Sequence, residues 1–246
     1  MVSFTLKTGL TLAAVMLAAS AASAQNFSGV TVNGLTSVYG LPALPTSFDG
    51  SGIAAVQNSL TAGTGRTLAF SSVTGTTTAN GGTAFGPDGG TFSSNTLDIQ
   101  NFNNLSGVFT TTQDRHMALF GVFTAGNPAG AAPARLDVTS DSFTDFSPLL
   151  NQVFLIGDGR VGVGGAIQQF SVPDAATTLY LGFADGFADG GVAFQGRPAS
   201  YNDNTGALTA SFTVVPGAAA TPEPGVWAMF GASALTGIGL LRRRRK

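Results

Sequence analysis

The middle of the chain consists of short apolar runs, several of which alternate with polar residues. In LTASFTVV, residues 208–215, every second side chain from Leu208 to Val214 is apolar. This period of two is typical of a strand with one face buried and the other in solvent. No helical period of 3.6 residues persists between residues 25 and 215. The pattern predicts nine strands, at 29–32, 66–73, 96–100, 116–123, 135–138, 152–157, 167–172, 177–184 and 208–215.

The connections between these runs are rich in glycine, proline, asparagine and aspartate, as in AFGPDGGTF at 84–92. These residue types form tight turns and irregular loops. Many short strands separated by turns predict an all-β fold, an antiparallel β-sandwich or jelly roll, over residues 25–215. The chain has no cysteine, so the fold is expected to depend on its core without disulfides.

The first 24 residues differ in pattern from the domain. Lys7 precedes an apolar run at 10–19, which is followed by the small residues Ala-Ser-Ala at 22–24. A charged lead, a short apolar segment and a small-residue exit are typical of a secretory signal peptide. We therefore expect residues 1–24 to be a signal peptide with cleavage between Ala24 and Gln25. The alternative is a hydrophobic first helix of the domain.

The end of the chain forms another distinct block. A linker rich in alanine and proline at 216–224 leads to seventeen uncharged residues at 225–241 and to the basic cluster RRRRK at 242–246. As a helix, the uncharged stretch would be about 25 Å long, slightly less than a hydrocarbon core of about 30 Å. We expect a single C-terminal transmembrane helix with its basic cluster in the cytoplasm and the domain outside.

Pro222, Glu223 and Pro224, followed by an uncharged helix and an arginine cluster, resemble the PEP-CTERM sorting signal of exported bacterial proteins. The resemblance implies that the tail holds a precursor in the inner membrane. It also implies that an exosortase-type processing enzyme cuts near the Pro-Glu-Pro motif and releases the protein to the cell surface or extracellular matrix. A permanent tail anchor is the alternative.

The charge of the central segment excludes one class of partner. Residues 25–221 contain twelve aspartates and five arginines, with no lysine or glutamate, so their net charge is −7. Binding to nucleic acid requires clustered cations, and we expect none here. An acidic segment could instead hold divalent cations.

Oxygen donors gather beside two of the predicted strands. Asp185 closes the strand at 177–184, and SYNDNTG at 200–206 leads into the strand at 208–215. If these strands are neighbours, the donors lie at one end of both. Calcium prefers six to eight oxygens from carboxylates, amides and carbonyls. The alternative is that asparagine and aspartate are present because they form turns.

The sequence is also similar to the bacterial calcium-dependent galactose-binding lectins of the PA-IL type, most closely over residues 147–215. The similar stretches are LFGVF, LNQVFLIGDG, QQFSVPDAATTLYLGFAD and YNDNTGALTASF. The resemblance implies a galactose-binding-domain-like β-sandwich. It also implies a calcium site formed by the side chains of Asp185, Asp203 and Asn204 and by the Ser200 carbonyl.

In those lectins two sugar hydroxyls bind the ion directly, so Asp185, Asp203 and Asn204 would also form the carbohydrate site. Two departures weaken the implied galactose specificity. Asp203 stands where the lectins have asparagine, and the histidine and glutamine that contact the sugar have no counterpart near 86–90.

These features predict an exported, non-catalytic surface or matrix protein that could bind a polysaccharide through calcium. The absence of cysteine, of a G-x-S-x-G motif and of glutamate from the domain leaves few residues for a hydrolase. One alternative is a structural component of the exopolysaccharide or biofilm matrix that binds no small ligand. The other is an enzyme acting on polysaccharide, which would need two aspartates about 5 to 10 Å apart.

Overall fold

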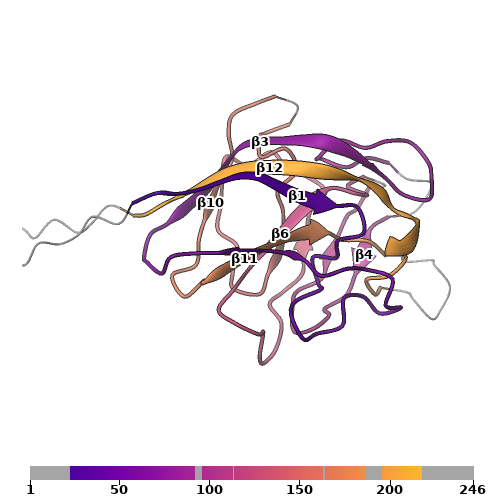
Figure 1. Ribbon diagram of the computed structural model, residues 1–246, viewed down its shortest axis with the longest axis horizontal. Coiled ribbons are helices and arrows are strands. Elements are labelled where there is room, and N and C mark those ends of the chain that lie inside the picture. Colours follow the sequence, from indigo (N-terminus) through magenta and orange to yellow (C-terminus); the bar gives the residue numbers. More distant parts are fainter. Residues whose placement is uncertain (1–22, 92–95, 113, 163, 187–195, 218–246) are drawn as a thin grey trace, which may run out of the picture.

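The computed structural model describes residues 23–91, 96–112, 114–162, 164–186 and 196–217 (Figure 1). Within these ranges no helix is long and apolar enough to cross a membrane. The expected signal peptide up to residue 22, the Pro-Glu-Pro motif, the membrane helix and the basic cluster lie outside the described residues.

The described part of the chain is all-β, as predicted, with twelve strands, one 3₁₀ turn and no α-helix. Each of the nine predicted segments overlaps a strand, although β1, β3, β6 and β12 extend beyond the predicted bounds, whereas β2, β5 and β8 were not predicted. The strands are β1 (Gln25–Asn33), β2 (Val56–Ser59), β3 (Thr67–Thr78), β4 (Asp98–Ile99), β5 (Val108–Phe109), β6 (Leu119–Thr124), β7 (Leu136–Asp137), β8 (Asp145–Phe146), β9 (Val153–Leu155), β10 (Gln169–Ser171), β11 (Thr178–Phe183) and β12 (Thr205–Val215).

The strands form three sheets, with the orders β1-β12-β3-β10-β8, β2-β11-β6-β9 and β4-β5-β7. We call them the first, second and third sheets. The pairings between the described strands are antiparallel except for β10 with β8 and β5 with β7. The fold is therefore mostly antiparallel, as expected.

The first sheet is built around its last strand. β12 pairs with β3 along its whole length, from Thr205 opposite Thr78 to Val215 opposite Thr67. On its other side β12 pairs with β1, so that Gln25 lies opposite Val214. Figure 1 shows β1 and β12 side by side although they lie at opposite ends of the described chain.

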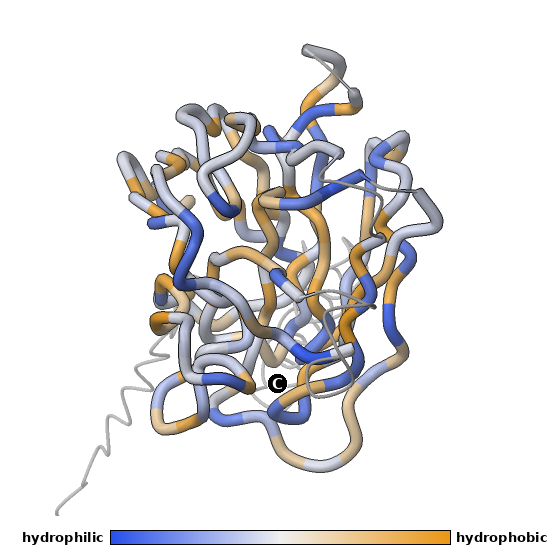
Figure 2. Tube along the Cα trace, turned by 90° about the vertical axis from the view of Figure 1, so that its right-hand side faces the viewer, coloured by the Kyte–Doolittle hydropathy of each residue, from blue (hydrophilic) through white to orange (hydrophobic). Residues whose placement is uncertain are grey.

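The first hydrophobic core lies between the first and second sheets. Phe70 and Phe212 of the first sheet belong to the same buried cluster as Phe123 and Leu179 of the second. The predicted alternation of β12 is confirmed, because Leu208, Ala210, Phe212 and Val214 are buried. Phe212 stacks on Phe27, with ring centroids 4.6 Å apart. In Figure 2 apolar segments run through the centre of the molecule, with polar segments around them.

A second core lies on the other face of the second sheet. Phe120 and Val122 of β6 pack there with Ile99 of β4 and Val108 of β5. All six residues of β6 are buried, which explains its unbroken apolar run, since a strand covered on both faces has no polar side. The third sheet and the segment 34–44 thus add a layer beyond the two sheets that a simple sandwich has.

Candidate functional site

The expected site lies where β11 and β12 reach the same end of the first core. Asp185 follows β11 and Asn204 precedes β12. The condition that these two strands are neighbours is not met, because β11 pairs with β2 and β6 in the second sheet while β12 pairs with β1 and β3 in the first. Their side chains meet nonetheless across the end of the core. The Asn204 Nδ2 group donates a hydrogen bond to Asp185 Oδ2 at 2.7 Å.

Both members of this pair are buried. The exposed fraction is 4% for Asp185 and 3% for Asn204. Asn204 Nδ2 also donates to the carbonyl oxygen of Gly34 at 3.3 Å. Its Oδ1 atom is buried and has no hydrogen-bond partner among the described residues. A buried acceptor without a partner destabilises the folded state by about 1 to 3 kcal/mol. A ligand that pairs with Asn204 Oδ1 would offset this cost.

Burial changes the acidity of Asp185. Desolvation raises the pKa of its carboxyl from 3.8 to about 7, while the hydrogen bond from Asn204 opposes this shift. The nearby charges of Asp203 and Asp49 raise the pKa further. Neither of the ion pairs that the described residues form involves Asp185. Among the described residues, the carboxylate therefore has negative neighbours and no cationic side chain bonded to it.

A buried tyrosine holds this end of the structure together. Tyr201 Oη accepts hydrogen bonds from the Asp185 backbone N–H and from Ser37 Oγ, each at 3.1 Å. The same hydroxyl donates to the Phe183 carbonyl at 3.1 Å. Burial raises the pKa of Tyr201, and the Asp185 charge adds to that effect. Tyr201 thus links β11 to the 3₁₀ turn at Tyr201–Asp203.

The segment 47–51 forms the next part of the site. Asp49 Oδ2 accepts a hydrogen bond from the Ser200 backbone N–H at 2.9 Å, and its Oδ1 atom accepts bonds from the hydroxyls of Ser47 and Ser51. Burial raises the pKa of Asp49, but these hydrogen bonds outweigh it and bring the pKa to about 2. Sequence reasoning missed both Asp49 and Tyr201. The spacing S-x-D-x-S at 47–51 was the available signal for Asp49.

The remaining predicted ligands lie on the same segment as Asn204. Ser200 has a left-handed backbone, with φ of 69°. The Asp203 side chain is exposed, and its carbonyl accepts a bond from Asn80 at 3.1 Å. The structure therefore brings Asp185 and Asn204 into direct contact, while Ser200 is fixed to Asp49 and Asp203 faces solvent.

The donor set fits calcium better than a transition metal. No group of three or more histidine, cysteine, aspartate or glutamate side chains is close enough to hold a metal in the ranges that the structure describes. An ion here would depend on the carboxylates of Asp185 and Asp203 together with neutral oxygens. Calcium accepts such oxygen ligands in irregular geometry. A half-turn of the Asn204 amide would direct its unpaired Oδ1 towards the Asp185 carboxylate, but it would break the Nδ2 bonds to Asp185 and Gly34 and would need a cation between the two oxygens.

Comparisons of the chain with protein-family models, with curated proteins and with solved structures find no match. A functional proposal therefore depends on the Asp185–Asn204 pair and its surroundings.

Proposed function

We propose that this chain is a non-catalytic carbohydrate-binding protein in which Asp185, Ser200, Asp203 and Asn204 hold calcium and the ion binds sugar hydroxyls. The observation that carries the proposal is the buried Oδ1 atom of Asn204, which lacks a hydrogen-bond partner among the described residues and belongs to a side chain bonded to Asp185. A buried acceptor and a buried carboxylate that forms no ion pair with the described residues make up part of an oxygen-lined cation site.

The chemistry of the site suits a weak calcium-dependent lectin. A bound divalent ion would offset the buried charge of Asp185 and offer open coordination positions to a vicinal diol. Two carboxylates with neutral oxygens are a modest ligand set, so we expect a dissociation constant of roughly 10⁻⁴ to 10⁻³ M, as in extracellular calcium modules. Asp185, Asp203 and Asn204 would orient the sugar through the ion.

The proposal extends to the fold and the location of the protein. The shared core of the first and second sheets supports a galactose-binding-domain-like β-sandwich or jelly roll, to which the third sheet is an addition. We further propose that residues 1–24 direct export and that residues 225–241 hold the precursor in the inner membrane. An exosortase-type enzyme then cuts near Pro222–Pro224 and releases the protein to the cell surface. β1 begins at Gln25, which agrees with cleavage between Ala24 and Gln25.

Titration calorimetry tests the binding step. Calcium chloride should give a saturable heat with the chain, and galactose or a neutral exopolysaccharide should then bind in calcium but not in chelator. Asp185→Ala should abolish both signals, and Asp203→Ala, which changes an exposed side chain, should weaken them without unfolding the protein. Asp145→Ala on the edge strand β8 is the matched control. Calcium binding that is equal in all four proteins, or absent from the unaltered chain, would refute the proposal.

A structural matrix component is the second candidate, and one observation favours it. The bond from Asn204 to Asp185 already satisfies part of the carboxylate without an ion. Absence of heat with every ligand above would support this candidate. For a polysaccharide-acting enzyme, a pair of aspartates in one cleft is the feature to seek. The two cavities described for this chain are lined by one aspartate each, Asp174 and Asp137.

A further inference from the structure

A groove lies at the opposite end of the first sheet from the Asp185–Asn204 pair. It has a volume of about 540 Å³ and opens between the start of β3, the segment after β8 and the turn after β10. Thr67 lines it at one end of β3, whereas Thr78 at the other end lies opposite Thr205, next to Asn204. Eleven residue steps of strand separate the two ends, which is roughly 36 Å.

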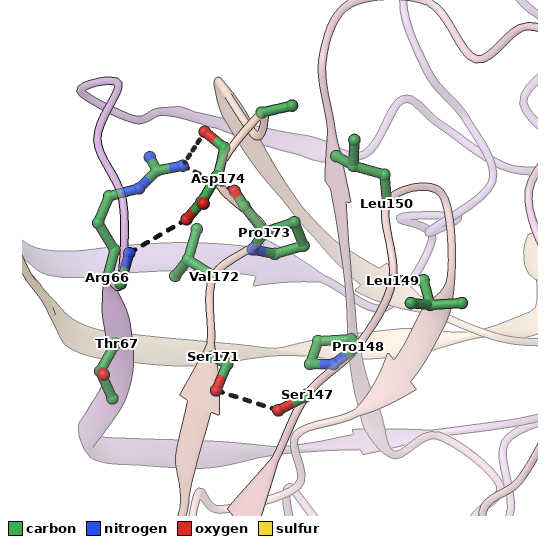
Figure 3. A pocket seen from close by; sticks show the side chains of 12 residues that line it. Arg66, Thr67, Ser147, Pro148, Leu149, Leu150, Ser171, Val172, Pro173 and Asp174 are labelled. Atoms are coloured by element: carbon green, nitrogen blue, oxygen red, sulfur yellow. Dashed lines mark hydrogen bonds between the residues drawn. The ribbon is translucent and has the colours of Figure 1, made fainter. Parts of the chain in front are cut away.

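The groove has apolar walls that are partly open to solvent, since Val172 and Pro148 are buried and Leu149 is exposed. Figure 3 shows Val172 and Pro173 on one side, with Leu149 and Leu150 on the other. Leu149 is 58% exposed. Covering these side chains would contribute roughly 25 cal/mol for each Å² of apolar surface removed from water.

One wall of the groove is fixed by a buried arginine. Arg66 donates hydrogen bonds to the carbonyls of Pro173, Asp174 and Ala176 at 2.8, 3.1 and 2.9 Å. The Gly65 backbone N–H donates to the Asp174 carboxylate at 3.1 Å. These bonds hold the turn after β10 against the start of β3, so a segment that enters the groove meets a preformed surface.

The chain itself leads into this groove. β12 ends at Val215, and a Cβ atom placed on Gly65, which lines the groove, would lie 3.5 Å from the Cα of Gly217. The next seven residues, AAATPEP at 218–224, lie outside the described residues. They could reach roughly 23 Å when extended. Extended proline-containing segments dock in preformed grooves because their backbone loses little entropy on binding.

We propose that residues 218–224 of the same chain occupy this groove, with the prolines and alanines covering Leu149, Leu150 and Pro173. The connection to the uncharged stretch at 225–241 is then packed on the domain. Glu223, the only glutamate in the chain, is held close to the domain surface, so a processing enzyme reaches the Pro-Glu-Pro segment only when it leaves the groove. The docking itself does not depend on calcium or sugar binding, whereas its effect on processing rests on the sorting step of the proposed function.

Disulfide trapping in the full chain tests the docking, because the protein has no cysteine of its own. Ser147 lines the groove, and Thr221 lies four residues beyond Gly217. In detergent micelles, the pair Ser147→Cys and Thr221→Cys should form an intrachain disulfide at least roughly tenfold faster than the control pair Ser71→Cys and Thr221→Cys, because docking raises the local thiol concentration. Equal rates for the two pairs overturn the proposal. Interchain disulfides also overturn it, since they place the tail of a second copy in the groove.

Proteolysis gives an independent readout. Glutamate-specific endopeptidases do not cut before proline, so the assay is run in a Pro224→Ala background, in which such an enzyme can cut the full chain after Glu223 only. Leu149→Asp should speed this cleavage by roughly tenfold, because the rate follows the population of the undocked segment. Ile167→Asp is the matched control, since Ile167 is 45% exposed and does not line the groove. A cleavage rate that Leu149→Asp leaves unchanged, or that both variants raise equally, overturns the proposal.

Discussion

The side-chain amide of Asn204 donates a hydrogen bond to the Asp185 carboxylate at 2.7 Å, although the two residues flank strands of different sheets. This bond joins the first and second sheets at one end of their shared core. Any change in the charge of Asp185 therefore acts on the junction between the sheets.

Without calcium, the chain should lose stability as the pH rises from about 4 to 8. Burial raises the pKa of Asp185 from 3.8 to about 7, so between these values the folded state holds the proton that the unfolded state has released. The free energy of unfolding then falls with pH, by about 1.4 kcal/mol for each pKa unit and by a few kcal/mol in all. Urea denaturation in chelator at several pH values measures the slope.

Asp185→Asn should remove most of that slope, and Asp145→Asn on β8 should not. The contribution of Asp49 to the pH dependence of stability has the opposite sign, because its pKa is lowered to about 2. Its contribution is lost only as the pH falls below the ordinary value of 3.8, outside this window. A slope that Asp185→Asn leaves intact would show that another group titrates.

Tyr201→Phe and Tyr39→Phe should have different effects on stability. The Tyr201 hydroxyl makes three hydrogen bonds, to Ser37, Asp185 and Phe183. Its loss should cost about 1 to 3 kcal/mol because buried groups lose their partner. The Tyr39 hydroxyl is buried and has no partner in the described part of the chain, so its removal should be neutral or stabilising. Denaturant unfolding compares the two; a larger loss for Tyr39→Phe would contradict the assigned network.

Gly75→Ala should destabilise the pairing of β3 with β12. Gly75 has φ of 107°, and a Cβ atom there would clash with the Ala207 carbonyl oxygen. Gly130 has φ of 81° and open space around it. Gly130→Ala should cost about 1 kcal/mol from backbone strain alone, and Gly75→Ala should cost clearly more. Thermal unfolding of both variants measures the difference, and equal losses would argue against this register.

Phe212→Ala should be among the most damaging core substitutions. Phe212 is 1% exposed and packs against Phe27 and Phe70, with ring centroids 4.6 and 5.0 Å away. Removing a buried phenylalanine costs about 3 to 5 kcal/mol. Val215→Ala, three residues along the same strand but 48% exposed, should cost less than about 0.5 kcal/mol. Urea denaturation checks both, and a similar cost at the two positions would contradict the orientation of β12.

Part of the candidate site could be predicted from the sequence. The strand pattern places Asp185 and the oxygen-rich run 200–206 beside two predicted strands, and the resemblance to calcium-dependent lectins implies the ligand roles of Asp185 and Asn204. The role of Tyr201 could not be foreseen, because its hydroxyl acts on residues 16 and 164 positions away. Asp49 joins the site through Ser200, 151 positions away, and a local pattern carries no information about such a contact.

The sequence by itself determined the strands with strong patterns, including the alternation of β12 and the unbroken apolar run of β6, because side-chain periodicity depends only on local backbone geometry. It did not reveal β2, β5 or β8, which are two to four residues long and depend on the strands beside them. Only the tertiary structure decided that β12 lies between β1 and β3, that a third sheet covers the second, and that Asp185 is buried against Asn204. These relationships depend on contacts between distant segments and on the exclusion of water from the space between them.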